Sequence, residues 1–428
     1  MNAKKTIVIL GAGFGGLRVA LVLARKLRQL TLTDRYEVVL IERNDHHTYT
    51  PLLYEVATTS KETANLRELH EVVAYRVADI VQRFPVRFVQ SEVAECDVLH
   101  GAIHLKNGET IRAHYLVIAL GSETNYFNIS GLKEAALPLK TLYDAVRIRD
   151  SFLELTASEL SEIKVVIGGG GPTGVELAGE IQLWCGHLEH EHPHCRLKVT
   201  LIEVKPTILF GFHPRIITLA QARLKKLGVE TVTNKKITAA AKNRIKFEDG
   251  SYLPYDLLVW TGGVKAQSVL SRTPLKSDPA SRIEVIGEME CLPQTSDLKL
   301  GARIYGLGDA ICFYDPITKK AIPGVARAAI SQGNVVAHNI IEEIKASQNP
   351  RYQPRVKSYQ PIEYPYITPV GGKFAIAKIG PIIISGFFGW ILKGLVELNY
   401  LVSIMPISKA LRIWLKGLRI FIQNERLG

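Results

Sequence analysis

Two glycine-rich segments of the chain have the residue types and spacing that bind the pyrophosphate of a dinucleotide. The first has glycines at 11, 13, 15 and 16 around Phe14, and an acidic residue, Glu42, follows further along beside Arg43. In this pattern Gly11 makes a tight turn, Gly13 lets the backbone approach the phosphates, and Gly16 lets helix and strand pack closely. The acid accepts hydrogen bonds from ribose hydroxyls.

The same pattern recurs in the middle of the chain. Its glycines are Gly169, Gly171 and Gly174, with Thr173 just before the third, and the acid is Glu203. A carboxylate at this place repels a 2′-phosphate, and only Lys205 lies nearby to offset it. The second segment therefore favours NADH over NADPH.

Three further turns are expected to bring the chain back to these segments. Two are small-residue turns that each end an apolar run, one containing Ala119 and Gly121 and the other Gly262 and Gly263. The third contains Asp309, whose carboxylate can bind sugar-type hydroxyls such as those of a ribityl chain.

The elements around these turns predict an α/β fold with two Rossmann-like dinucleotide-binding domains. Continuous apolar runs are typical of buried parallel strands, and here they precede or follow each turn. The expected strands are residues 6–10, 37–41, 115–120, 164–167, 198–202, 257–260 and 304–307. Helices are expected over 17–27 and from Val175 onward.

Composition narrows the class of protein. The length of 428 residues predicts two or three domains, and the formal charge of +12 suits an anionic membrane surface or a polyanionic partner. No nucleic-acid-binding motif is present, and the N-terminus lacks a secretory pattern.

The five cysteines form no C-x-x-C pair, so a reduced environment is expected. No run reaches the ~20 apolar residues of a membrane span, and the longest, 379–392, is predicted to be core.

The chain resembles the type II NADH:quinone oxidoreductases, which are single-subunit, non-proton-pumping flavoproteins with a glutathione-reductase-like fold. The resemblance runs from about Lys5 to about Gly333 and continues more weakly to the C-terminus. The most specific motifs are GPTGVELAGE at 171–180, HTYTPLLYEVA at 47–57, WTGGV at 260–264 and GLGDA at 306–310. Thioredoxin and glutathione reductases and sulfide:quinone reductases are disfavoured, because their cysteine arrangements are missing.

The resemblance implies non-covalent FAD in the first unit, NADH in the second, and a lipid-soluble quinone that arrives from the membrane side. It places Glu176 beside the nicotinamide and flavin rings, although a carboxylate at a helix N-terminus is also stable without such a role. The family's A-Q-x-A-x-Q-Q motif falls on 326–332, where Gln332 remains but Arg327 and Ser331 replace two glutamines. Arg327 either binds a quinone oxygen or is an exposed helix charge. Lys373 and Lys378 are candidates for a positive charge near the flavin.

A cluster of histidines and cysteines at 185–195 contains metal-ligand residue types. It lies where the second unit crosses from helix to strand, contains Pro193, and matches no established spacing. We expect a solvated surface loop there and no metal site.

The C-terminal region predicts an extended segment over 348–369, a hairpin over 374–384 and a helix over 387–402. A last helix begins near Ser408. Its apolar arc is Leu411, Trp414, Leu415, Leu418, Phe421 and Ile422, and its basic arc is Lys409, Arg412, Lys416 and Arg419. Such a helix fits the surface of an anionic membrane, or alternatively a contact with its own protein or a second subunit.

The expected organisation is therefore an FAD domain from 1–121 and 264–345, an NADH domain at 122–263, and a C-terminal amphipathic, membrane-facing segment at 346–428. The expected activity is hydride transfer from NADH to flavin, then two-electron reduction of a quinone, at the cytoplasmic face of the cell membrane. Two alternatives are a reductase of a soluble acceptor and a redox-sensing flavoprotein that acts through partner binding. A homodimer is left open.

Overall fold

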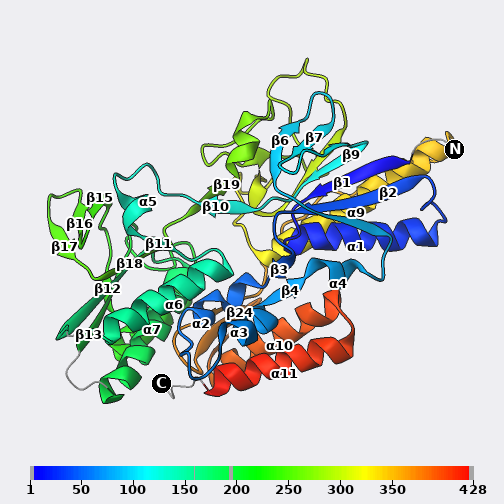
Figure 1. Cartoon of the computed structure of the whole chain (residues 1–428). Coiled ribbons are helices and arrows are strands. Elements are labelled where there is room, and N and C mark those ends of the chain that lie inside the picture. The colour runs from blue at the N-terminus through cyan, green and yellow to red at the C-terminus, as the bar shows by residue number, and fades with distance from the viewer. Residues whose placement is uncertain (1–3, 159, 192–195, 424–428) are drawn as a thin grey trace. The chain divides into compact units, whose positions relative to one another are not determined.

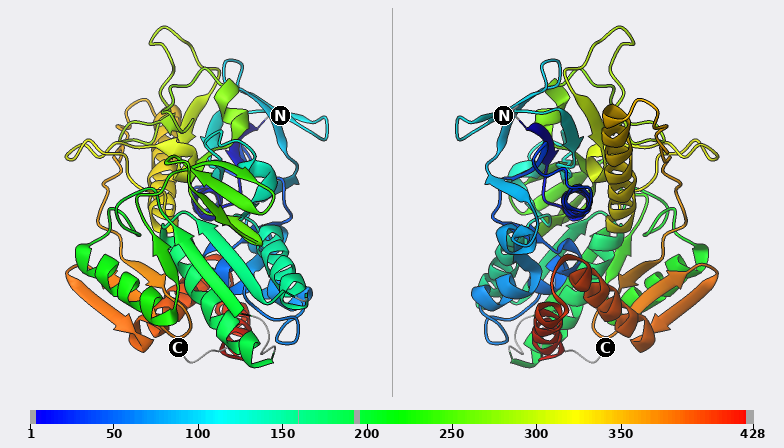
Figure 2. Two further views of the ribbon diagram at one scale, coloured as in Figure 1. Left: turned by 90° about the vertical axis from the view of Figure 1, so that its left-hand side faces the viewer. Right: turned by 90° about the vertical axis from the view of Figure 1, so that its right-hand side faces the viewer.

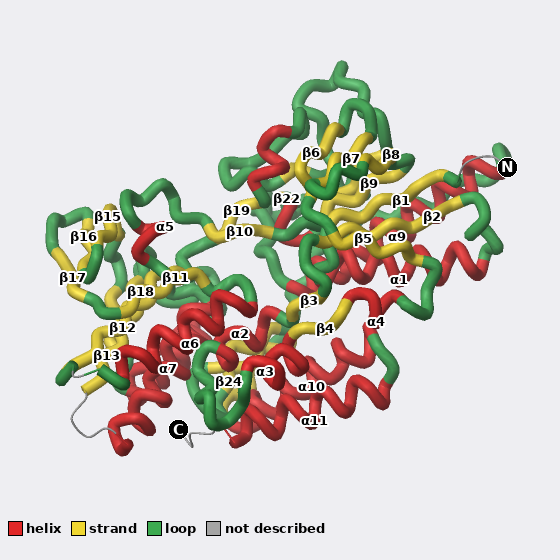
Figure 3. The backbone as a smooth tube through the Cα atoms, in the orientation of Figure 1, coloured by secondary structure: helices red, strands yellow, loops and turns green. Residues whose placement is uncertain are grey.

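The computed structural model describes residues 4–158, 160–191 and 196–423, with the side chains of 185–191 and 423 left out. The chain divides into two compact units. Unit 1 contains residues 1–47, 75–123 and 264–364, and unit 2 contains residues 48–74, 124–263 and 365–428. Strands and helices alternate within each unit, as Figures 1 and 3 show.

Unit 1 is built on a parallel five-stranded sheet of order β21-β9-β1-β2-β5. The strands are β1 (Lys5–Leu10), β2 (Tyr36–Glu42), β5 (Val86–Gln90), β9 (Tyr115–Ile118) and β21 (Arg303–Gly306). Helices α1 (Phe14–Gln29) and α9 (Ala326–Gln348) pack against each other in this unit (Figure 1). Residues Ile7 to Leu10 of β1 are fully buried, which is why this strand is apolar at successive positions.

The remaining elements of unit 1 are short. An antiparallel sheet contains β6 (Val93–Asp97), β7 (Ala102–Leu105) and β8 (Thr110–Arg112). The other elements are α4 (Val77–Val81), β19 (Val264–Ala266), η2 (Ser268–Arg272), β20 (Ile283–Glu284), η3 (Gly308–Ala310) and β22 (Ile311–Cys312). Strands β3 (His46–Thr48), β4 (Ala74–Arg76) and β10 (Ser122–Thr124) contain points at which the chain passes between units.

Unit 2 repeats the parallel design with a sheet of order β11-β18-β12-β13-β14. Its strands are β11 (Leu137–Pro138), β12 (Glu162–Gly168), β13 (Arg196–Ile202), β14 (Glu230–Val232) and β18 (Leu257–Trp260). Its helices are α5 (Leu132–Ala135), α6 (Leu142–Thr156), α7 (Pro172–Glu191) and α8 (Pro214–Leu227). An antiparallel sheet adds β15 (Ile237–Ala241), β16 (Arg244–Phe247) and β17 (Tyr252–Pro254).

The C-terminal part of unit 2 follows the expected order of elements. After an extended segment come β23 (Tyr366–Pro369), β24 (Ala375–Ile379) and β25 (Ile382–Gly386), then α10 (Phe387–Ile404) and α11 (Ile407–Gln423). Helices α10 and α11 pack side by side (Figure 2, right). The unit also contains η1 (Thr50–Leu52), α2 (Leu53–Val56) and α3 (Leu66–Val73).

Three expectations need correction or remain untested. Helix α7 continues to Glu191, so the backbone from 185 to 191 is helical and not the expected loop, while residues 192–195 lie outside the described part of the chain. Helix α10 alone among the described helices is long and apolar enough to cross a membrane by length and composition, whereas no such segment was expected. The compact units also differ from the expected domains, because residues 48–74 and 365–428 group with the second dinucleotide-binding sheet.

The two arcs of α11 are only partly as predicted. Leu411, Leu415 and Ile422 are exposed, but Trp414 donates a hydrogen bond from Nε1 to the carbonyl of Gly394 in α10 at 2.8 Å. The Lys416 ammonium pairs with Glu71 of α3 at 2.6 Å. Trp414 of the apolar arc and Lys416 of the basic arc therefore contact the protein itself, which is the alternative to lipid that the sequence left open.

Candidate functional site

The first glycine turn lies between β1 and α1 of unit 1, and its glycines differ in what surrounds them. A β carbon at Gly11, whose φ is 102°, would lie 2.3 Å from the carbonyl oxygen of Ala119, and one at Gly16 would lie 1.9 Å from that of Gly11. At Gly13, by contrast, no described atom comes within 4 Å of such a carbon. The protein's own backbone therefore fills the space beside Gly11 and Gly16, whereas the space beside Gly13 is empty. A ligand is expected to approach the backbone closely at Gly13.

The second glycine turn repeats this arrangement in unit 2, between β12 and α7. A β carbon at Gly169, at φ 112°, would lie 2.5 Å from the Cα of Gly262, and one at Gly174 would lie 1.9 Å from the carbonyl oxygen of Gly169. Around Gly171 the described atoms leave the same open space as at Gly13. Both turns therefore leave the start of their helix accessible to a phosphate, which helix N-termini bind through free amides and the helix dipole.

The two predicted acids are held in the same way by their own turns. Glu42 accepts a hydrogen bond from the backbone N–H of Ala12 at 2.9 Å through Oε2, while Oε1 accepts from the N–H of Asn44 at 3.2 Å. Glu203 accepts from the N–H of Gly170 at 2.7 Å and from that of Lys205 at 2.8 Å. A carboxylate has about four lone-pair sites, so each acid retains capacity for ribose hydroxyls.

The other predicted binding residues lie around the same turns. Phe14 contacts the ring of His47 edge-on, with the ring centres 5.0 Å apart. A β carbon at Gly15 would lie 2.2 Å from a methyl group of Leu307, so Gly15 allows close packing below the turn. Arg43 and Thr173 are exposed, and Gly121 and Gly263 have positive φ values of 68° and 155°.

Buried His47 holds the first turn, a role that the sequence did not indicate. Its Nδ1 lies 2.9 Å from the carbonyl oxygen of Ala12, inside the glycine segment, and the side chain is 2% exposed. Desolvation lowers the pKa of His47 to about 4, so the ring is neutral at physiological pH. Because the partner is a carbonyl, Nδ1 carries the hydrogen and donates it.

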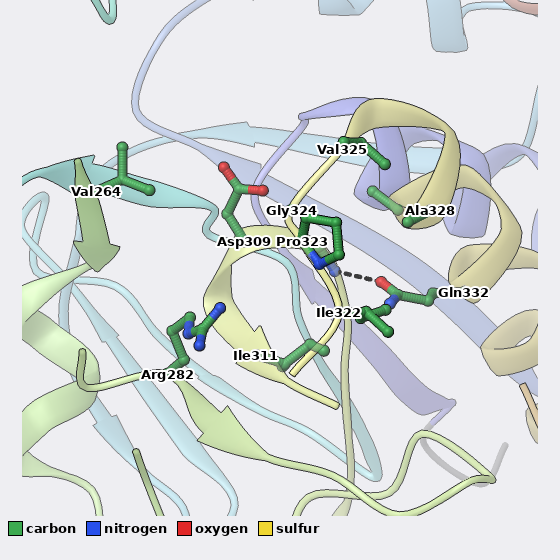
Figure 4. A pocket seen from close by; sticks show the side chains of 12 residues that line it. Val264, Arg282, Asp309, Ile311, Ile322, Pro323, Gly324, Val325, Ala328 and Gln332 are labelled. Carbon is green, nitrogen blue, oxygen red and sulfur yellow. Dashed lines mark hydrogen bonds between the residues drawn. The ribbon is translucent and has the colours of Figure 1, made fainter. Parts of the chain in front are cut away.

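Asp309 lies on a pocket of unit 1 at the start of α9 (Figure 4). Its Oδ2 accepts a hydrogen bond from the hydroxyl of Ser122 at 2.8 Å, and a β carbon at Gly324 would lie 2.4 Å from Oδ1. Val325, the N-cap residue of α9, makes no side-chain hydrogen bond to the first turn of that helix. A carboxylate beside the N-terminus of a helix suits a ligand that carries both hydroxyls and partial negative charge.

Gln332 and Arg327, both predicted as acceptor-side residues, occupy different environments. Gln332 is 2% exposed, lines this pocket, and accepts a hydrogen bond from the N–H of Gly308 at 2.8 Å through its side-chain oxygen (Figure 4). Its oxygen therefore positions the turn that carries Asp309. Arg327 is exposed at the first turn of α9.

Glu176 lies in the first turns of α7 within a group of ionisable side chains in unit 2. Desolvation raises its pKa well above the usual value, and the charge of Glu180 adds to the shift. The other members of this group are Tyr54 and Glu55, which lie in the HTYTPLLYEVA motif, and Lys393 and Glu397, which the sequence did not single out. Their burial could have been inferred from the sequence of α10, in which Lys393 and Glu397 are the only charged residues and lie four positions apart.

Among the described residues no group of three or more His, Cys, Asp or Glu side chains is arranged to hold a metal ion. The cysteine and histidine cluster of 185–195 is outside the described side chains, so the expectation for it remains a prediction.

The fold and both turns define a class of flavoprotein, and comparison with known proteins agrees. Residues 5–333 match the family model of the pyridine nucleotide-disulphide oxidoreductases. Within that class the chain belongs to the type II NADH:quinone oxidoreductase family and is an oxidoreductase.

Individual relatives are similar over most of their length. The chain is 28% identical over 435 residues to the type II NADH:quinone oxidoreductase Ndh of Mycobacterium tuberculosis, which covers 96% of this chain and 87% of the relative. It is 28% identical over 348 residues to the demethylphylloquinone reductase NdbB of Synechocystis, covering 79% and 80%. The structure of NDH2 from Plasmodium falciparum in complex with NADH has the same fold, with a TM-score of 0.80 at 17% identity and 99% of each chain covered.

The residues present fit the nucleotides that this family binds. FAD and NAD(H) need room for a pyrophosphate beside the backbone, and both Gly13 and Gly171 have that room. They also need an acceptor for ribose hydroxyls, and Glu42 and Glu203 are each held by an amide of their own turn. Each of these features lies within a single unit.

The hydrogen bond from His47 to Ala12 generates a prediction about cofactor retention. Replacing His47 with Phe keeps a ring but leaves the Ala12 carbonyl without its donor, which costs about 1–3 kcal/mol for a buried group. We expect the FAD dissociation constant, measured by fluorescence of released flavin, to rise ~5- to 100-fold. His100→Phe, at an exposed histidine of the same unit, should leave retention unchanged. Equal retention in both variants would contradict a positioning role for His47.

Proposed function

We propose that the chain binds FAD in unit 1 and NADH in unit 2 and passes two electrons from NADH to a lipid-soluble quinone without pumping protons. The observation that carries this proposal is the duplication of one turn geometry. In each unit no described atom lies within 4 Å of the β-carbon position at the second glycine, and the third glycine lies against the carbonyl oxygen of the first. In each unit an acid also accepts a hydrogen bond from a backbone amide of the turn.

The residues around each turn have separate roles in this proposal. In unit 1, Glu42 binds the adenosine ribose, the amides after Gly13 bind the pyrophosphate, and Asp309 binds the ribityl hydroxyls. Bound FAD supplies the chemistry by accepting a hydride equivalent from NADH and releasing two electrons to the acceptor. The start of α9 stabilises negative charge in this region, because its dipole is positive there. In unit 2, Glu203 binds the nicotinamide dinucleotide's adenosine ribose, and Glu176 lies at the start of α7.

The acceptor in this proposal is a quinone. The names of relatives at 28% identity include a quinone oxidoreductase and a demethylphylloquinone reductase, which supports a quinone. Arg327 and Ser331 replace glutamines of the family motif, and buried Gln332 has its oxygen bonded to Gly308. We therefore place acceptor selectivity on Arg327 rather than on Gln332.

Peripheral attachment to a membrane would deliver such an acceptor. The exposed apolar side chains of the C-terminal helices are Phe387, Phe388, Ile391, Leu395, Val396, Val402, Ile407, Leu411, Leu415 and Ile422. Arg412 and Arg419 of α11 are basic residues of the same helix pair. Apolar and basic residues on paired helices support binding at an anionic interface. Helix α10 also packs against the β23-β24-β25 sheet, which favours a surface position over a span.

Anaerobic stopped-flow spectroscopy tests this function directly. NADH should bleach the flavin absorbance rapidly, and mixing with a quinone should restore it rapidly over repeated turnovers. Fast recovery only with soluble acceptors would indicate a soluble-acceptor reductase. Slow bleaching with negligible turnover would indicate a redox sensor.

Glu203 should set the choice between NADH and NADPH. Glu203→Gln keeps the size of the side chain and removes the charge that repels a 2′-phosphate. We expect the NADH-over-NADPH ratio of kcat/KM to narrow by at least ~10-fold, equivalent to ~1.4 kcal/mol. Glu162→Gln, at an exposed acid of β12, is the matched control. An unchanged ratio in Glu203→Gln would show that the nicotinamide dinucleotide does not bind at this turn.

The exposed apolar residues of α11 should anchor the protein to lipid. Leu411 and Leu415 are 39% and 55% exposed, so a double Leu→Gln variant avoids the face that packs on α3 and α10. We expect its affinity for anionic vesicles, measured by co-sedimentation, to fall at least ~10-fold. Ile317→Gln, at an 88% exposed isoleucine of unit 1, should bind as the parent protein does. Undiminished sedimentation of the double variant would exclude α11 as the anchor.

A further inference from the structure

The loop of residues 204–213 follows Glu203 directly and connects β13 to α8 in unit 2. It carries two exposed apolar side chains, since Val204 is 51% exposed and Phe210 is 60% exposed. Single apolar residues are common on protein surfaces, so their exposure alone assigns no role to them. The way in which the loop is held gives the evidence for one.

Hydrogen bonds fasten the loop to the second glycine turn. The backbone N–H of Leu209 donates to the carbonyl oxygen of Gly170 at 2.7 Å, and the N–H of Gly170 donates to Oε2 of Glu203 at 2.7 Å. Near the other end of the loop, the N–H of Lys205 donates to Oε1 of Glu203 at 2.8 Å. Phe210 therefore follows a residue whose backbone is bonded to the glycine turn itself.

The backbone on both sides of Phe210 is left-handed. Leu209 has a φ of 49°, which a leucine rarely adopts, and Gly211 has a φ of 90°. The side chain of Leu209 is 1% exposed, so burial and the bond to Gly170 together enforce this conformation. Such strain persists only where the surrounding structure imposes it, and it is concentrated at ligand sites. Here it accompanies a reversal, because Leu209 is buried and the next side chain, Phe210, is exposed.

The side chain of Lys205 orients the exposed ring. Its Nζ lies 5.7 Å from the centre of the Phe210 ring, a cation–π distance. The backbone N–H of the same lysine is bonded to Glu203, so the ammonium reaches the ring from a fixed point. Phe210 thus presents an aromatic surface that is exposed and also restrained, in the loop that begins at the acid.

An adenine base matches the chemistry of this loop. The proposed function places the adenosine ribose on Glu203, and the base is bonded directly to that ribose. A purine has two flat faces that gain affinity by stacking on an aromatic side chain. Phe210 offers such a ring, and exposed Val204 adds apolar surface next to the acid.

We propose that Phe210 stacks on the adenine of the nicotinamide dinucleotide and thereby determines the base that the second turn accepts. This inference rests on the proposed function, because it requires NADH to bind in unit 2. Glu203 then recognises the ribose hydroxyls, and Phe210 recognises the base. Lys205 is a positioning residue that acts through the ring. All three residues belong to unit 2.

Binding of ADP-ribose to the FAD-loaded protein tests the proposal, since this ligand keeps the adenine and lacks the nicotinamide. We expect Phe210→Leu to raise its dissociation constant, measured by calorimetry, at least ~10-fold. Phe210→Tyr, which keeps a ring, should bind as the parent protein does. Bleaching of the flavin by reduced nicotinamide mononucleotide, which has no adenine, should be equally fast in Phe210→Leu and the parent.

Tyr252→Leu is the matched control, because Tyr252 is a 56% exposed aromatic residue of the same unit with Arg244 and Lys246 over its ring. Its affinity for ADP-ribose should equal that of the parent protein. A loss of affinity as large as in Phe210→Leu would show that exposed aromatic residues of unit 2 act unspecifically, and would overturn the assignment to Phe210.

Three further results would overturn the proposal. They are parent-like ADP-ribose affinity in Phe210→Leu, an equal loss in Phe210→Tyr, and a parallel loss of bleaching by the mononucleotide, which would make Phe210 only structural. If Phe210→Leu does not fold, Phe210→Trp decides. ADP-ribose should quench its added fluorescence, and unaltered fluorescence would exclude stacking. A parent protein that binds no ADP-ribose would instead refute the proposed NADH site itself.

Discussion

The nucleotide sites depend on one close contact in each glycine turn, between the third glycine of the fingerprint and the carbonyl oxygen of the first. At Gly16 and Gly174 any β carbon would lie 1.9 Å from the oxygen of the first glycine in the same turn. Without a side chain there, the helix starts directly above the strand that leads into it. The first amides of α1 and α7 then face open space at Gly13 and Gly171, where a phosphate is stabilised by donors that are already oriented.

The same turns also position the acids that follow. Glu42 and Glu203 come from the neighbouring parallel strand, and each uses one oxygen to accept an amide of the turn. The acid therefore ties the second strand to the first loop before any ligand arrives. Binding a dinucleotide then needs little rearrangement, because both the phosphate donors and the ribose acceptor are fixed by hydrogen bonds within the unit. His47 adds a third restraint, on the carbonyl of Ala12.

The C-terminal helices combine two opposed requirements. Their outer residues are apolar and exposed, which suits a lipid interface, while Lys393 and Glu397 on the inner face of α10 are enclosed with α2. A soluble helix usually carries its charges outward and its apolar residues inward. This reversal in α10 is consistent with the lipid-facing position proposed for its outer side.

The sequence by itself determined the parts of this protein that depend on local chemistry. Apolar runs next to glycines predict buried strands that end in tight turns, and the predicted order of strands, helices and turns is confirmed. Long-range packing decided the rest. The helical wheel of α11 could not assign Trp414 or Lys416, because their partners Gly394 and Glu71 lie elsewhere in the chain. Nor could residue spacing assign Gln332, whose oxygen is bonded to Gly308, or the buried pair of Glu55 and Lys393, which lie more than three hundred positions apart. Residue type and spacing specify a turn, whereas the pairing of buried polar groups is fixed only when distant segments pack together.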